Sequence, residues 1–323
     1  MSESIRFFPS EDSRIYVAGH RGLVGSAIVR SLGRSGCTSI LTRHRDVLDL
    51  EDGARVDEFF RSERPTHVFL AAAKVGGILA NSSFPADFIR ANVAIQLNVI
   101  DAARRHGVRR LIFLGSSCIY PKFAEQPIRE EALLGGPLEP TNEAYAIAKI
   151  AGIKQCQSYN KQYGTEFVCL MPTNLYGPFD NFDLATSHVL PALIRKFHEA
   201  KLASSPSVTI WGSGTPRREF LHVDDLADAC VHMAFHPNAM DNDLYNIGCG
   251  DDIAIADLAA MVARVVGWRG ELVFDRSKPD GTPRKLLDVS KVARMGWSAR
   301  IPLEQGIQST YHWYLNNQLG SEA

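Results

Sequence analysis

A tyrosine and a lysine four residues apart, Tyr145 and Lys149, are well placed in this sequence to move a proton. They fall in a helix predicted over residues 141–163, where positions i and i+4 lie on the same face. Free tyrosine titrates near pH ~10, so a nearby cation is needed to stabilise its phenolate near neutrality. Such a pair also arises by chance on exposed helices, and the interpretation therefore needs a second observation.

Ser116 supplies that observation. It follows directly on an apolar strand predicted over residues 109–115, within the phrase Gly-Ser-Ser-Cys-Ile-Tyr. Ligands of open α/β sheets meet the carboxyl ends of the strands, so Ser116 is placed to hydrogen-bond a carbonyl oxygen. Together with Tyr145 as an acid and Lys149 as its electrostatic partner, it forms a set suited to proton transfer at a carbonyl group.

A glycine-rich turn, G-x-x-G-x-x-G, separates the first predicted strand from the first predicted helix. Glycines let the backbone approach a pyrophosphate closely, and the helix N-terminus offers free N–H groups with a partial positive charge. A tight turn without a ligand is the alternative. The turn predicts a dinucleotide site formed by Gly19, His20, Arg21, Gly22, Leu23, Val24 and Gly25.

The end of the second predicted strand distinguishes between the two nicotinamide dinucleotides. An NAD site would carry an acidic residue there to hold the ribose, whereas residues 41–46 read Leu-Thr-Arg-His-Arg-Asp. Arg45 and Arg21 are suited to grip a 2′-phosphate through charge-assisted bonds, which favours NADPH over NADH. Asp46 remains a candidate for the ribose, and solvated loop charges remain the other interpretation of the arginines.

Short apolar runs alternate with segments of helical period, which predicts an α/β fold, a Rossmann-type doubly wound parallel sheet. Strand runs that are apolar nearly throughout suit a sheet covered on both faces. The predicted strands cover residues 14–18, 39–42, 67–71, 109–115 and 166–171, and the predicted helices residues 23–33, 51–62, 85–106 and 141–163.

Beyond residue 177 the loops lengthen and the strands become shorter, which predicts a division into residues 1–177 and a smaller substrate-binding α/β lobe, residues 178–323. Some elements of this lobe are expected to return to the first sheet. Asp224 and Asp225 are expected to cap a helix and not to bind a metal. The lobe's predicted helices cover residues 187–200, 224–235, 254–266 and 303–316, and its predicted strands residues 208–211 and 272–274.

Composition and charge exclude several classes of protein. The 35 Lys and Arg against 36 Asp and Glu leave a net charge of -1, so no nucleic-acid partner is expected. No apolar run approaches the roughly 20 residues of a bilayer span, and residues 1–13 are interpreted as a frayed leader without a secretory signal. The six cysteines form no C-x-x-C pair, and no zinc-ligand spacing occurs, which predicts reduced thiols in the cytoplasm and no metal.

The glycine turn combined with Ser116, Tyr145 and Lys149 resembles the extended branch of the short-chain dehydrogenase/reductase superfamily. A stretch of the second lobe, Pro-Arg-Arg-Glu-Phe-Leu-His-Val-Asp-Asp at residues 216–225, looks like the R-x-F-x-H-V-x-D motif of its nucleotide-sugar epimerases and dehydratases. Resemblance to one family, the GDP-L-fucose synthases, extends over nearly the whole chain through the phrases at residues 71–77, 115–121, 171–177 and 278–285.

That resemblance implies an activity, a cofactor and a partner. The family converts GDP-4-keto-6-deoxy-D-mannose into GDP-L-fucose by epimerising two carbons and then reducing the ketone with NADPH, and a homodimer built on the helix of Tyr145 is implied. Epimerisation beside a ketone needs a base, an acid and stabilisation of the enolate oxygen, and Ser116 and Tyr145 can hold that oxygen in both steps.

The resemblance also assigns roles to residues. It makes Cys118 the base and His188 the acid of epimerisation, although a buried structural thiol and a helix-start histidine are the alternatives. It extends the cofactor site to Leu114, Gly115, Ser116, Tyr145, Lys149, Pro172, Thr173, Asn174, Leu175 and His188. It places Lys196, Trp211, Arg218 and Asp280 around the nucleotide sugar, with Lys196 where the family often carries an arginine.

Two other functions fit parts of the pattern. A UDP-sugar 4-epimerase would keep the scaffold and hold NAD tightly, returning the hydride to its substrate. A non-catalytic NADPH sensor would keep the dinucleotide site and act on a partner, although the intact set of Ser116, Tyr145 and Lys149 argues against it.

Overall fold

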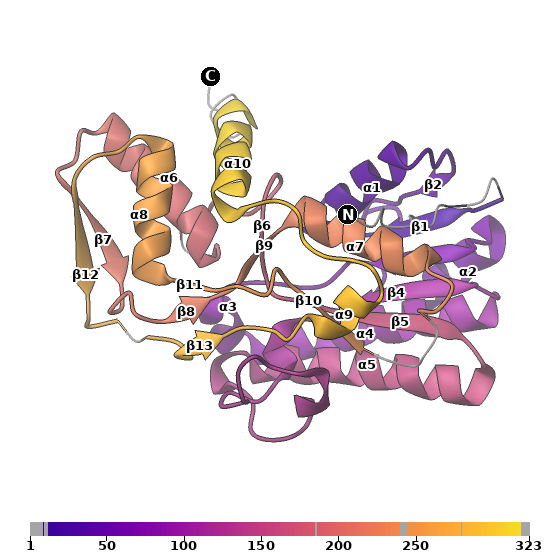
Figure 1. Ribbon diagram of the computed structural model, residues 1–323. Coiled ribbons are helices and arrows are strands. Elements are labelled where there is room, and N and C mark those ends of the chain that lie inside the picture. The colour runs from indigo at the N-terminus through magenta and orange to yellow at the C-terminus, as the bar shows by residue number, and fades with distance from the viewer. Residues whose placement is uncertain (1–8, 10–11, 185, 240–243, 279, 318–323) are drawn as a thin grey trace.

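A parallel sheet forms the centre of the computed structural model, which describes residues 9, 12–184, 186–239, 244–278 and 280–317 (Figure 1). All pairs of neighbouring strands run parallel. The strand order reverses between β1 and β3, which makes that point the place where a ligand of such a sheet binds. The strands are, in order, β2 (Ile40–Leu41), β1 (Ile15–Ala18), β3 (His67–Leu70), β4 (Arg110–Leu114), β5 (Glu166–Pro172) and β10 (Leu244–Ile247).

Helices cover both faces of this sheet, because alternate strand residues point to opposite sides. Tyr16 packs into one apolar core and its neighbour Val17 into the other. The first core is covered by α2 (Gly53–Glu63), α4 (Pro85–Arg105) and α5 (Glu143–Tyr163). The second is covered by α1 (Leu23–Arg34), α7 (Val223–Phe235) and α9 (Ser290–Arg294). The sheet is therefore doubly wound, as predicted.

A second group of elements lies beside the sheet, to the left in Figure 1, around a core of its own. It contains α6 (Val189–Leu202), α8 (Ile255–Val266) and α10 (Leu303–Asn317), with β7 (Ser207–Trp211) parallel to β12 (Glu271–Asp275). Two small sheets lie between this group and the main sheet. They pair β6 (Asn174–Tyr176) with β9 (Phe220–His222), and β8 (Arg217–Arg218) with β11 (Ile253–Ala254) and β13 (Arg284–Lys285).

Several short elements of the structure were not predicted from the sequence. The largest omission is β10, which adds a strand to the main sheet from the second half of the chain. The boundary at residue 177 stays a prediction, because β10, α7 and α9 pack with the first sheet although they follow that boundary. The other omissions include α3 (Ile78–Ser83) and three 3-10 turns, η1 (Ser117–Ile119), η2 (Glu130–Ala132) and η3 (Pro140–Asn142).

The start of α7 corrects one expectation. Asp224 and Asp225 do not cap the helix, because the Nδ1 atom of His222 accepts the N–H of Asp224 at 3.2 Å. Asp224 forms an ion pair with Arg30 of α1 at 2.7 Å. Asp225 accepts the N–H groups of residues 300–301 at 3.1 and 2.9 Å. Both carboxylates therefore attach α7 to other parts of the chain.

Two further predictions concern the leader at the N-terminus and the absence of a membrane-spanning helix. Most of residues 1–13, interpreted as a leader, lies outside the described residues. Among the helices that the structure describes, none combines the length and the apolar composition that crossing a bilayer requires.

Close packing fixes α5 against α4 and β4. The amide nitrogen of Gln96, on α4, donates to the carbonyl of Ala148 on α5 at 2.6 Å. A Cβ added at Gly152 of α5 would lie 2.4 Å from Cζ of Phe113 and 2.7 Å from the side-chain oxygen of Gln96. Glycine at this position therefore lets the helix of Tyr145 approach the sheet.

We expect Gly152→Ala to lower the free energy of unfolding by about 1–3 kcal/mol, since overpacking forces side chains or backbone to shift. Urea unfolding measures the change. The control is Gly33→Ala on α1, where an added Cβ meets nothing within 4 Å, and it should raise stability by about 0.5–1 kcal/mol. An unchanged midpoint for Gly152→Ala would contradict the packing argument.

Candidate active site

The glycine turn lies at the end of β1, beside the segment that follows β3. Gly19 has φ +85, and a Cβ there would lie 2.8 Å from the amide nitrogen of Ala72. A Cβ on Gly25 would lie 2.1 Å from the Gly19 carbonyl oxygen. Gly22 caps α1 without a side-chain bond, and the first turn of α1 has no acidic residue. The turn is thus compact, and the first N–H groups of the helix suit an anion such as a dinucleotide's pyrophosphate.

Basic side chains surround this turn. Arg21 is exposed and His20 is half-buried. The pKa of His20 is lowered by burial and further by the nearby charges of Arg21 and His44. His44 also bonds Asp46 at 2.7 Å, so Asp46 serves a histidine here. No role was predicted for His44, although it stands between Arg43 and Arg45 in the segment predicted to bind the 2′-phosphate.

The two arginines after β2 differ in their surroundings. Arg43 bonds Glu63 and lies over the ring of Phe59, 5.3 Å from its centroid, so it is engaged within the protein. Arg45 is 73% exposed and pairs with Glu51 at 2.9 Å. The Glu51 carboxylate also pairs with Arg90 at 2.9 Å, so the exposed Arg45 is not its only partner.

The predicted catalytic set comes together at the end of β4. The Lys149 ammonium donates to the carbonyl of Leu114 at 2.8 Å. The same nitrogen lies 5.7 Å from the ring centroid of Tyr145. Ser116 follows β4, and its hydroxyl oxygen accepts the N–H of Cys118 at 3.4 Å. The structure therefore groups Ser116, Tyr145, Lys149 and Cys118.

Burial governs the protonation of this set. It raises the pKa of the Tyr145 phenol, and the nearby Cys118 raises it further. It lowers the pKa of Lys149 to about 8. The pKa of the phenol is therefore raised in the protein alone, contrary to the lowering expected from Lys149. The phenol stays protonated, which is the form that a proton donor to an oxygen anion requires.

Cys118 and His188 share a neighbour that sequence analysis missed. Burial raises the pKa of the Cys118 thiol, while the charge of Lys285 and the bond to Ser116 lower it. Burial lowers the pKa of His188, and Lys285 lowers it further. Lys285, from β13, therefore lies close to both groups. Lys285 could have been suspected from the sequence, because it ends the stretch at residues 278–285 that resembles the family.

The segment after β5 is held by hydrogen bonds to β10 and to the residue between β8 and β9. The N–H of Thr173 donates to the Ile247 carbonyl at 3.0 Å. The Thr173 hydroxyl and the Asn174 amide both donate to the Glu219 carbonyl, at 3.2 and 2.8 Å. Pro172 closes β5, so the predicted cofactor segment 172–175 lies at the carboxyl end of the sheet.

The four residues predicted to meet the nucleotide sugar also gather. The Lys196 ammonium lies 5.4 Å from the ring centroid of Trp211, which is 65% exposed. Asp280 accepts the N–H and the hydroxyl of Ser213, at 2.8 and 2.7 Å. Burial lowers the pKa of the half-buried Arg218, and the Asp280 carboxylate opposes that effect. An open aromatic face with fixed charges beside it suits a nucleotide.

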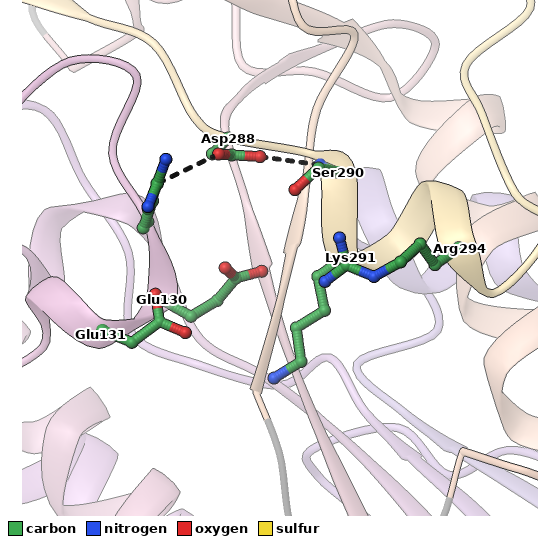
Figure 2. A pocket seen from close by; sticks show the side chains of 7 residues that line it. Glu130, Glu131, Asp288, Ser290, Lys291 and Arg294 are labelled. Carbon is green, nitrogen blue, oxygen red and sulfur yellow. Dashed lines mark hydrogen bonds and ion pairs between the residues drawn. The ribbon is translucent and has the colours of Figure 1, made fainter.

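A hollow of about 490 Å³ lies elsewhere, at the open edge of β10, and contains none of these residues (Figure 2). Its charged side chains form hydrogen bonds to backbone groups of the protein. Glu130 accepts the N–H of Asn246 at 2.9 Å, and Lys291 donates to the Leu244 carbonyl at 3.1 Å. Asp288 accepts the N–H of Ser290 at 2.8 Å, so the hollow is interpreted as a seam that closes the sheet edge.

Comparison with known proteins agrees with this geometry. The model of the NAD dependent epimerase/dehydratase family matches residues 15–248. A probable GDP-L-fucose synthase 1 of Oryza sativa subsp. japonica is 56% identical, over 98% of this chain and 96% of its own length. The GDP-L-fucose synthase of Escherichia coli (strain K12) is also 56% identical, over 94% of this chain and 97% of its own length. The chain belongs to the GDP-L-fucose synthase family.

A solved member shares the architecture. The structure of a GDP-L-fucose synthetase from Naegleria fowleri bound to NADP has a TM-score of 0.90 and 30% identity, covering 97% of this chain and 96% of its own. The predicted family and the predicted doubly wound fold are both confirmed.

Proposed function

We propose that this member of the family converts GDP-4-keto-6-deoxy-D-mannose into GDP-L-fucose, by epimerisation at two carbons followed by NADPH-dependent reduction of the ketone. The observation that carries the proposal is the grouping of Ser116, Tyr145, Lys149 and Cys118 at the end of β4, beside Lys285. The high identity to named GDP-L-fucose synthases over nearly the whole chain supports the same reaction.

The cofactor fits the residues around the glycine turn. The N–H groups at the start of α1 hold the pyrophosphate, and Arg21 and Arg45 bind the 2′-phosphate with His44 beside them. Use of NADP(H) agrees with the family and with the relative solved with NADP bound. When bound, NADPH supplies the hydride that reduces the ketone carbon.

Proton transfer precedes reduction. The ketone acidifies the hydrogens on both neighbouring carbons, and the Cys118 thiolate removes one of them. Lys285 favours that thiolate, since its charge lowers the Cys118 pKa against the effect of burial. The same charge lowers the pKa of His188, so the protonated imidazole is a stronger acid when it returns a proton to the carbon.

One oxygen site serves both steps. Ser116 and Tyr145 donate hydrogen bonds to the ketone oxygen while it carries the enolate charge. Tyr145 then gives its proton to the same oxygen during reduction, and Lys149 stabilises the phenolate that forms. The protonated phenol of the free protein is the correct starting form for this transfer.

The nucleotide end of the substrate lies against the second group of elements. Arg218 and Lys196 supply cations for the diphosphate, Trp211 supplies a stacking face, and Asp280 orients the loop through Ser213. Lysine binds phosphate as a point charge, so Lys196 does not form the two-pronged clamp that an arginine would.

The substrate assay tests the reaction itself. Purified protein should consume NADPH with the keto-deoxymannose nucleotide and release GDP-L-fucose. If it consumes none and instead interconverts the C4 epimers of a UDP-sugar, the proposed function is wrong and the UDP-sugar 4-epimerase alternative holds. Loss of activity in Tyr145→Phe separates either enzyme from an NADPH sensor.

We expect Cys118→Ser and His188→Asn to slow epimerisation by about 10²–10⁴-fold, the usual contribution of a positioned acid or base. Deuterium uptake from D₂O at the two substrate carbons measures this step. NADPH affinity, followed by nicotinamide fluorescence, should stay within about threefold and serves as the control. Uptake at the wild-type rate in either variant would remove that residue from the mechanism.

Replacing Arg21 and Arg45 by alanine should weaken NADPH by about 10–100-fold and leave NADH nearly unchanged, because only NADPH carries the 2′-phosphate. Titration calorimetry with each dinucleotide measures the difference. Arg34→Ala, at the last turn of α1, is the control and should change neither affinity. Equal losses for the two dinucleotides would refute the assignment.

We also propose a homodimer built on α4 and α5. Leu97 and Ile147 lie on these helices with 51% and 42% of their surface exposed, which leaves an apolar face that a second copy can cover. Light scattering should give twice the mass of the chain, and Leu97→Asp should give a monomer. Leu202→Asp, on exposed α6 surface, is the control and should stay dimeric. A wild-type monomer would contradict the proposal.

We also infer where the protein is located in the cell and how its two parts divide the work. A cytoplasmic location is supported by the six cysteines, all described and all free thiols. The division of labour at residue 177 is supported by the sites, since the dinucleotide and catalytic residues precede it, except for His188, and the residues for the nucleotide sugar follow it.

A further inference from the structure

Glu219 is a fully buried carboxylate that stands in the sequence between the cation Arg218 and the core residue Phe220. Its two oxygens accept the N–H groups of Gly250 and Leu287, at 2.8 and 3.0 Å. The resemblance to known enzymes gave this residue no role. Its burial and its bonds to distant segments make it a candidate for positioning, since a buried acceptor that loses a donor is costly.

The chain makes room for this carboxylate. A Cβ added at Gly248, after β10, would lie 2.2 Å from an oxygen of Glu219. Burial raises the pKa of the Glu219 carboxyl, while the backbone bonds from Gly250 and Leu287 lower it. The carboxylate is thus held largely by neutral donors whose places in the fold are fixed.

The backbone of Glu219 makes further links. Its carbonyl accepts the Thr173 hydroxyl and the Asn174 amide of the segment after β5. Its N–H donates to the carbonyl of Lys285 at 3.3 Å, within the pairing of β8 and β13. One residue therefore contacts the predicted cofactor segment, the strand of Arg218 and the strand of Lys285.

We infer that Glu219 is a positioning residue that fixes the distance between the segment Thr173–Asn174, beside the cofactor, and two cations, Arg218 beside the nucleotide sugar and Lys285 beside the reacting carbons. The inference rests on the proposed function of that site. It follows from geometry. The carboxylate of Glu219 accepts the N–H of Leu287, two residues after Lys285, and the backbone carbonyl of Glu219 accepts the Asn174 amide of the cofactor segment. Hydride transfer requires both molecules at a set separation, which such a link maintains.

The test uses Glu219→Gln, which keeps the volume and replaces one oxygen by an NH₂ group that cannot accept the facing N–H. We expect single-turnover hydride transfer to slow by about 10-fold and the Kd of GDP to rise by about 10-fold. The isotope effect with 4-deuterated NADPH should increase, because the hydride step becomes limiting. NADPH affinity, set mainly at the glycine turn, should change by less than about threefold.

The control is Glu130→Gln. Glu130 is also a buried carboxylate that accepts a backbone N–H, from Asn246 at 2.9 Å, but it lines the hollow beside β10 (Figure 2), whose lining includes none of the proposed site residues. A purely structural role for Glu219 predicts that both variants lower the melting temperature and leave the isotope effect unchanged. A positioning role predicts a larger isotope effect in the Glu219 variant alone.

A second variant covers the case in which Glu219→Gln fails to fold. Gly248→Ala keeps the charge and displaces the carboxylate, so it should raise the isotope effect in the same direction. Wild-type hydride transfer and GDP affinity in whichever of the two variants folds, or equal changes in Glu130→Gln, would overturn the inference. Failure of the wild-type protein to reduce the keto sugar would instead overturn the proposed function.

Discussion

The hydrogen bond from the Lys149 ammonium to the Leu114 carbonyl is the interaction on which the site depends. It joins the middle of α5 to the last residue of β4, and Ser116 follows two residues later. Tyr145 lies one helical turn before Lys149 on the same face of α5, so the bond also brings the phenol toward the end of β4. The buried ammonium is costly, as its lowered pKa of about 8 indicates, and the close approach of α5 at Gly152 makes the bond possible. The helix cannot rotate or slide without breaking this bond, and the catalytic geometry is therefore tied to the packing of α5 on the sheet.

Burial and nearby charge together set the starting protonation states of the site: they oppose each other at Cys118 and act in the same direction at His188. Burial keeps the Tyr145 phenol and the Cys118 thiol protonated and His188 neutral. Lys285 is the group whose charge favours the thiolate while disfavouring the imidazolium. It comes from β13, in the small sheet between the main sheet and the second group of elements, so the proposed epimerisation depends on how that small sheet packs beside the main sheet. Because each bound partner brings charge of its own, we expect the balance to shift toward the reactive forms only when the site is filled.

Local patterns predicted much of this protein from its sequence. The strand and helix runs of the first 170 residues have clear periods, the glycine turn and Ser116 directly follow predicted strands, and the Tyr145–Lys149 spacing is contained within one helix. Prediction failed where an element is short and depends on distant partners. β10 has four residues and pairs with β5 about 75 positions earlier, so nothing in its own sequence marks it as part of the main sheet. The role of Lys285 beside Cys118 was missed for the same reason, because no periodic pattern connects residues so far apart. The prediction for the cap of α7 failed for a different reason. The N-cap residue is a histidine, His222, and not one of the small polar or acidic residues that usually occupy this position.

The way the two groups of elements are joined explains why one residue such as Glu219 can matter to chemistry that it does not touch. The groups meet through strands of only two or three residues, β6 with β9 and β8 with β11 and β13. Pairings this short contribute few backbone bonds, so side chains must define the register. Glu219 does this from the centre, because it follows β8, precedes β9 and bonds to the segments on either side. A buried carboxylate accepts bonds at both of its oxygens, whereas the amide of a glutamine accepts at only one of its two terminal atoms. The separation of the two binding sites is thus held by one buried group within otherwise sparse pairing, and the site can be altered there without changing a residue that touches substrate.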